Sequence, residues 1–116
     1  MSKSNNEDWQ LLDRVALQAV MARYFQGVDR NDQRQIRACF TEDVKGTYTG
    51  RGTVVGVDEM LAMLRPHFEN LEKGAIRVAT HFMGTFNVDR LEGDTAETET
   101  YAIACLVRAG EPDHVA

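Results

Sequence analysis

Two long extended segments near the carboxyl end constrain the fold of this chain more than any other feature. Residues 75–90 and 95–108 are rich in β-branched and apolar residues, and Leu91-Glu92-Gly93-Asp94 between them is typical of a hairpin turn. In the second segment acidic residues alternate with threonines before the chain becomes wholly apolar. The pattern predicts a long antiparallel strand pair, one face of which helices have to cover.

The first forty residues are predicted to supply two of those helices. Apolar residues recur at steps of three and four from Leu11 to Phe25, which predicts an amphipathic helix capped by Asp8 and ending near Gly27. A polar turn over residues 29–32 leads to a short second helix through Ile36, Cys39 and Phe40. The two helices are expected to pack at an angle to each other.

The middle of the chain is predicted to form a short hairpin and a third helix. Residues 44–55 combine β-branched residues with glycines, which predicts two short strands with Gly50-Arg51-Gly52 at the tip. A helix with an apolar stripe is predicted from Asp58 to about Lys73. Three helices and mainly antiparallel strands describe the α+β class.

Composition and charge narrow the function classes. The 116 residues suit a single domain over residues 1–116, with residues 1–7 as a flexible arm. With a net charge of −5 and no run of Lys or Arg, the sequence lacks the basic patch that binding to nucleic acid or to an anionic membrane requires. No segment resembles a signal peptide or a membrane span, which favours the cytoplasm. Cys39 and Cys105 lack metal-site spacing, so no metal site is predicted.

One histidine stands out as a candidate for chemistry. His81 has apolar neighbours in a strand-like segment, and Asp29 follows the first helix where the chain is expected to turn. An imidazole paired with a carboxylate can act as a tuned acid or base. Alternatively, His81 lines a pocket without chemistry and Asp29 bonds to its local backbone. Contact between the two side chains decides between these interpretations.

Four short segments, taken in order, resemble a known family. They are residues 24–32, 40–44, 55–61 and 80–82, and they resemble the SnoaL-like branch of the nuclear transport factor 2-like superfamily. The resemblance implies a cystatin-like roll, in which a cone-shaped, curved, mixed or antiparallel sheet packs on three amino-terminal helices around a deep apolar cavity. Relatives continue with further strands, so the chain looks short at its carboxyl end. An uncovered sheet edge favours a homo-oligomer, expected as a dimer through the sheet.

Within that superfamily the residues are most similar to scytalone dehydratase and polyketide cyclases. By position, the resemblance implies that His81 is the catalytic base, Asp29 holds its ring, and Tyr48 donates to the substrate carbonyl. The expected substrate-binding residues are Tyr24, Tyr101 and Phe82. No cofactor is required. The tyrosines have an ordinary alternative role as packing residues.

One departure from the dehydratase keeps three functions open. The dehydratase has a second histidine on the following strand, whereas residues 101–106 contain none, and Tyr101 is the nearest substitute. The sequence favours a cofactor-independent lyase or isomerase, of dehydratase or cyclase type, acting on a small cyclic carbonyl or polyketide-like compound. The alternatives are a ligand-binding module without turnover and a structural or dimerisation domain.

Overall fold

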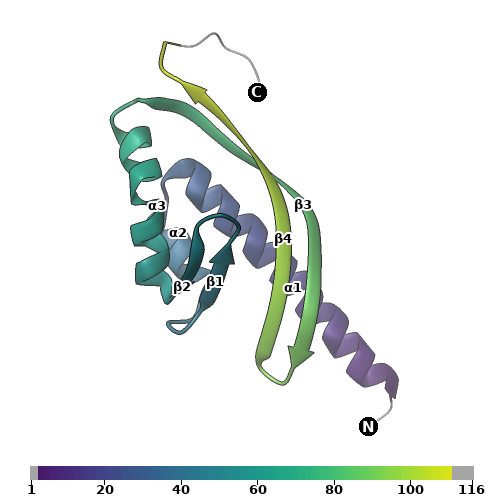
Figure 1. Cartoon of the computed structure of the whole chain (residues 1–116). Coiled ribbons are helices and arrows are strands. Elements are labelled where there is room, and N and C mark those ends of the chain that lie inside the picture. Colours follow the sequence, from purple (N-terminus) through teal and green to yellow (C-terminus); the bar gives the residue numbers. More distant parts are fainter. Residues whose placement is uncertain (1–2, 111–116) are drawn as a thin grey trace.

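A long antiparallel hairpin lies across a long helix, and both extend beyond the rest of the molecule (Figure 1). The computed structural model describes residues 3–110. Its helices are α1 (Lys3–Arg30), α2 (Gln33–Ala38) and α3 (Val57–Glu72), and its strands are β1 (Lys45–Tyr48), β2 (Gly52–Val55), β3 (Ile76–Glu92) and β4 (Thr95–Arg108). The projecting halves of α1 and of the hairpin give the molecule extents of 60 × 28 × 25 Å.

The α+β class predicted from the sequence is confirmed. Strand β1 pairs with β2 and β3 pairs with β4, both antiparallel, and the helices pack against these hairpins (Figure 1). Among the described residues the two hairpins share no ladder, so the single curved sheet expected from the resemblance is here two separate two-stranded sheets. None of the helices in residues 3–110 combines the length and the apolar composition that a membrane-spanning helix needs.

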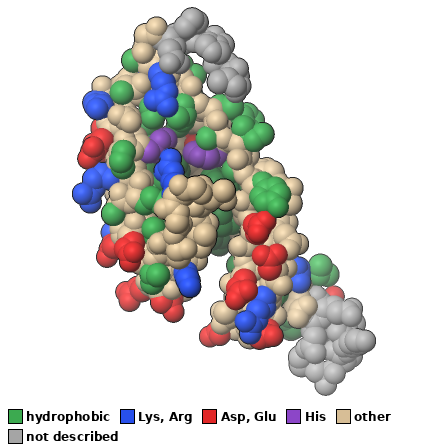
Figure 2. Space-filling view, viewed as in Figure 1, with side chains coloured by type: hydrophobic (Ala, Val, Ile, Leu, Met, Phe, Trp, Pro, Cys, Tyr) green, Lys and Arg blue, Asp and Glu red, His purple; other side chains and the backbone are tan. Residues whose placement is uncertain are grey.

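The β3–β4 hairpin gives the site one of its two walls. Its turn lies at Gly93, which has a φ of 56°, as the Glu-Gly-Asp sequence predicted. Successive strand residues point to opposite faces. His81, together with Ala79 and Met83, therefore faces α1, whereas Phe82 faces the opposite side. Acidic side chains gather over the tip of the hairpin in Figure 2.

Helix α1 gives the other wall, and its bounds differ from the prediction at both ends. It begins at Lys3 rather than at Asp8, so residues 3–7 of the expected arm are helical, and residues 1–2 lie outside the described part. It ends at Arg30, and Asn31 then adopts the left-handed conformation, with a φ of 52°. Asn31 therefore terminates the helix, a role that the sequence had suggested for Gly27.

The reason why Gly27 does not end the helix is its contact with α2. A Cβ at this position would lie 2.8 Å from Cγ1 of Ile36, which is too close for any side chain. Gly27 thus permits a close approach of two helices instead of a turn. The helix continues for another turn, and Asp29 consequently lies on the helix rather than in the loop after it.

The core lies where the second half of α1 meets α2 and α3. Its buried members are Tyr24, Val28, Ile36, Met60, Leu61, Leu64 and Phe68. The apolar stripe predicted for the third helix is confirmed by its buried residues. The short hairpin is also confirmed, with its tip at Gly50 and Gly52, both of positive φ. The stripe of α1, in contrast, is buried only in its second half: Leu12 and Val15 remain 62% and 67% exposed.

Candidate active site

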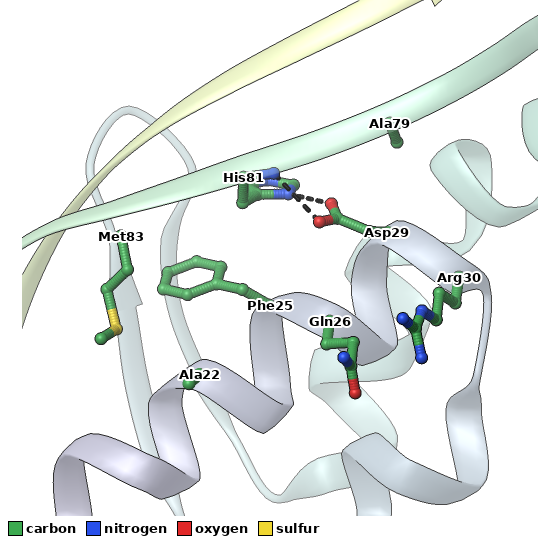
Figure 3. Close-up of a pocket in the computed structure, with 8 residues that line it drawn as sticks. All are labelled: Ala22, Phe25, Gln26, Asp29, Arg30, Ala79, His81 and Met83. Carbon is green, nitrogen blue, oxygen red and sulfur yellow. Dashed lines mark hydrogen bonds and ion pairs between the residues drawn. The ribbon is translucent and has the colours of Figure 1, made fainter.

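The two residues selected as a dyad meet in the structure. Asp29 Oδ1 lies 2.5 Å from Nδ1 of His81, and Asp29 Oδ2 accepts a hydrogen bond of 3.0 Å from the backbone N–H of His81 (Figure 3). The two side chains come from the last turn of α1 and the first half of β3 and are each 18% exposed. The Asp29 carboxylate therefore forms hydrogen bonds with both the ring and the backbone of His81.

The hydrogen bond between Asp29 and the ring of His81 determines which tautomer the imidazole adopts. An ionised carboxylate only accepts hydrogen bonds, so Nδ1 of His81 carries the proton that it shares with Asp29. In the neutral ring Nε2 is then the nitrogen that can accept a proton. The Phe25 ring stacks on the imidazole at a centroid distance of 5.3 Å and an interplanar angle of 18°. Carboxylate and phenyl ring together restrict the orientation of His81.

An open groove lies beside the dyad. It has a volume of about 370 Å³ and lies between α1 and β3 (Figure 3). Its lining residues are Ala22, Phe25, Gln26, Asp29, Arg30, Ala79, His81 and Met83. The expected site was a deep apolar cavity, whereas this groove is open and carries polar groups. The polar groups come from Gln26 and Arg30, which lie on either side of Asp29 in α1 and bring an amide and a guanidinium to the groove.

The tyrosines expected at the site bind each other outside this groove. The Tyr24 and Tyr48 hydroxyl oxygens lie 2.6 Å apart. Burial raises the pKa of Tyr24, and the neighbouring Tyr48 raises it further. Burial also raises the pKa of Tyr48, opposed by its hydrogen bond with Tyr24 and by the charge of Arg51. Both phenols therefore keep their protons at neutral pH, and neither lines the groove.

The other two expected substrate-binding residues lie on the opposite face of the hairpin. Phe82 neighbours His81 along β3 and is 56% exposed, and Tyr101 on β4 is 60% exposed. Neither lines the groove, because strand alternation turns residue 82 away from α1. A ligand in the groove has no contact with these two side chains.

The sequence interpretation missed several lining residues. Phe25, Gln26 and Arg30 lie three or four residues from Asp29 or next to it, on one side of the helix, and Met83 lies two residues beyond His81 on the strand. Helical and strand periods applied to the dyad would have found them. Among residues 8–110, whose side chains the structure describes, no three His, Cys, Asp or Glu side chains come together as a possible metal site.

Comparison with known families agrees with this architecture. The sequence profile of the SnoaL-like domain matches residues 9–116. The chain therefore belongs to the SnoaL-like family, as its four short segments indicated. No curated protein is significantly similar to it in sequence.

Several solved structures share the fold. A provisionally named aromatic ring hydroxylase from Novosphingobium aromaticivorans is 29% identical, with a TM-score of 0.65 over 85% of this chain and 68% of that one. A provisionally named scytalone dehydratase from the same organism is 20% identical, with a TM-score of 0.70 over 91% and 68%. Hexachlorocyclohexane dehydrochlorinase LinA type 3 from Novosphingobium barchaimii is 19% identical, with a TM-score of 0.63 over 84% and 66%. The last two likenesses establish the nuclear transport factor 2-like fold.

Proposed function

We propose that this protein is a cofactor-independent lyase or isomerase that uses His81 as a general base. The observation that carries the proposal is the contact of both Asp29 carboxylate oxygens with His81, at 2.5 and 3.0 Å. This arrangement holds the imidazole with Nδ1 protonated and leaves Nε2 for proton transfer beside a groove. The names of two structural relatives, a dehydratase and a dehydrochlorinase, describe eliminations and support the same reaction class.

The proposed reaction begins with removal of a proton next to a carbonyl group. His81 Nε2 takes the proton and becomes imidazolium, which Asp29 stabilises, while the C–H electron pair forms an enolate. In an elimination the enolate expels a hydroxyl group on the adjacent carbon, and the imidazolium returns its proton to the departing oxygen to give water. In an isomerisation the same proton returns to a different carbon. Both routes leave His81 neutral for the next cycle.

The proposed substrate is a small cyclic carbonyl or polyketide-like compound. A groove of about 370 Å³ accommodates a compound of one or two rings, and Phe25 and Met83 offer apolar contact. Gln26 and Arg30 add polar groups at the same opening. We propose Tyr48 as the donor to the carbonyl oxygen, because it is more accessible than Tyr24. A substrate that reaches Tyr48 has to extend past the residues that line the groove.

A non-catalytic ligand-binding role is the second candidate, and one observation favours it. The residue opposite His81 on β4 is Ala104, and Ala102 lies opposite Met83. Strand β4 therefore brings no second acid to the groove, so His81 has to serve as both base and acid. A binding module needs the groove but not the proton transfer.

Substitution of the dyad distinguishes the two candidates. Wild-type protein is screened with cyclic hydroxy-ketones, and turnover is then compared in His81→Ala and Asp29→Asn. We expect either variant to lose about 10²- to 10⁴-fold in kcat/KM, the usual contribution of a positioned acid or base. Asp58→Asn is the matched control, because Asp58 is exposed, forms an ion pair with Arg37 and does not line the groove. Unchanged turnover in His81→Ala would leave the binding role.

We also propose that the protein forms a homodimer through the outer face of the β3–β4 hairpin, in the cytoplasm. Val78, Phe82, Tyr101 and Ile103 lie on this face and are 49% to 67% exposed, and Phe82 is directly opposite Ile103 in the ladder. Sedimentation analysis tests the dimer. Phe82→Asp is expected to give a monomer, whereas Val55→Asp, at an apolar residue 53% exposed on β2, is expected to leave the dimer intact. A monomeric wild type contradicts the proposal.

A further inference from the structure

The turn of α1 that carries Asp29 is also held from α3. Nε2 of His67 lies 3.0 Å from the backbone carbonyl oxygen of Val28, the residue immediately before Asp29. A carbonyl oxygen only accepts hydrogen bonds, so Nε2 of His67 carries a proton and donates it. His67 is half-buried, and its ring contacts Phe68 of the core edge-on at a centroid distance of 5.7 Å. The hydrogen bond and the aromatic contact together restrict the orientation of the His67 ring.

The Val28 carbonyl, which His67 binds, receives only a long backbone hydrogen bond from the end of α1. At the end of α1, the N–H of Asp32 donates to the Gly27 carbonyl at 2.8 Å, whereas the N–H of Asn31 is 3.5 Å from the Val28 carbonyl. The second distance is beyond the usual range for a backbone hydrogen bond. Without His67, the Val28 carbonyl would thus have only a poor donor among these helix-end groups.

A second contact from α3 lies just beyond Asp29. The Asn31 side-chain amide donates to the Glu72 carboxylate at 3.1 Å. Residues 28 and 31 therefore bracket Asp29, and both are bound by α3. The backbone that carries Asp29 is fixed on either side by an element that takes no part in the groove.

We infer that His67 is a positioning residue for the Asp29–His81 pair. It donates to the peptide group that joins Val28 to Asp29, so a change in this contact rotates the peptide and moves the Asp29 carboxylate. That carboxylate contacts both the ring nitrogen and the backbone N–H of His81, so a displacement that keeps one contact can break the other. A misplacement of about 1 Å in a catalytic group can cost about 10²-fold in rate. The catalytic part of this inference rests on the proposed function, whereas the geometric part does not.

The test compares two substitutions of His67 in the whole chain. His67→Gln keeps an N–H donor near the position of Nε2, and His67→Leu keeps bulk without a donor. The first readout is the NMR signal of the His81 Nδ1 proton, identified by its loss in His81→Ala. We expect this proton to exchange faster with water in His67→Leu and to keep its wild-type exchange rate in His67→Gln. This readout requires no substrate.

The second readout is turnover. We expect kcat to fall about ten- to a hundredfold in His67→Leu while KM stays nearly constant, and His67→Gln to restore most of kcat. If circular dichroism shows that His67→Leu does not fold, His67→Asn replaces it, because its amide is too short to reach the Val28 carbonyl. Wild-type exchange of the His81 proton in the folded donor-less variant overturns the inference. If Asp29→Asn leaves turnover unchanged, the proposed function fails, and the proton-exchange result still decides the role of His67.

Discussion

The two halves of α1 have the same spacing of apolar residues, but only the second half buries them. Leu11, Leu12 and Val15 in the first half are 60% to 67% exposed, whereas Tyr24 and Val28 in the second half are 4% and 3% exposed. The second half packs against α2, α3 and the near part of β3, and the first half projects along the outer part of the hairpin (Figure 1). A helical period identifies an apolar face, but only the elements opposite that face decide whether it is buried.

The catalytic candidate lies in the buried half, and this location has a physical reason. A carboxylate can hold an imidazole at two atoms only if its own backbone is fixed to within a fraction of an ångström. Val28 anchors the backbone of Asp29 in the core, and Gly27 lets α2 pack directly behind it. The exposed half of the helix offers no such support.

The largest expected difference comes from the same substitution in each half. Val28→Ala removes two buried methyl groups and leaves a cavity, so we expect a loss of about 2 kcal/mol in the free energy of unfolding. Val15→Ala removes exposed groups and adds helix propensity, so we expect a change within about 0.5 kcal/mol. Urea denaturation measures both. An equal loss in Val15→Ala would mean that another surface covers the first half in solution.

A smaller effect is expected at the contact between α1 and α2. Gly to Ala in an open helix stabilises by about 0.5–1 kcal/mol, but at Gly27 the new Cβ meets Ile36 Cγ1 at 2.8 Å. We expect the clash to reverse the sign, with a net loss of about 1 kcal/mol. A double-mutant cycle with Ile36→Ala, which removes the atom in the way, checks the cause. Additive free energies of unfolding would contradict it.

The smallest effect is expected in how the free energy of unfolding depends on pH in the alkaline range. The folded state raises the pKa of Tyr24 and of Tyr48, so above about pH 10 the unfolded chain loses phenolic protons that the folded chain keeps. The contribution of these two tyrosines to the free energy of unfolding is therefore constant below about pH 10 and falls as the pH rises further. Tyr24→Phe should make this fall shallower in urea titrations at several pH values. Trp9→Phe, in the exposed half, should keep the wild-type slope.

The sequence predicted most of the fold and, of the residues that line the groove, Asp29 and His81. The two hairpins, the third helix and the α+β class followed from local patterns, because turn glycines and strand or helix periods act over a few residues. The pairing of Asp29 with His81 joins residues 52 apart. The residue types suggested it as one of two interpretations, and the family resemblance favoured it. Phe82 and Tyr101 were expected at the substrate, and the strand alternation that directs His81 inward directs Phe82 outward.

The sequence by itself determined where helices and strands form, which residues can carry a proton, and the SnoaL-like family to which the chain belongs. The tertiary structure decided which of two similar apolar faces is buried, that Gly27 is a packing contact and Asn31 the helix end, and that Tyr24 binds Tyr48 outside the groove. Local propensity depends on neighbours in the chain, whereas burial and tautomer depend on atoms that only folding brings together.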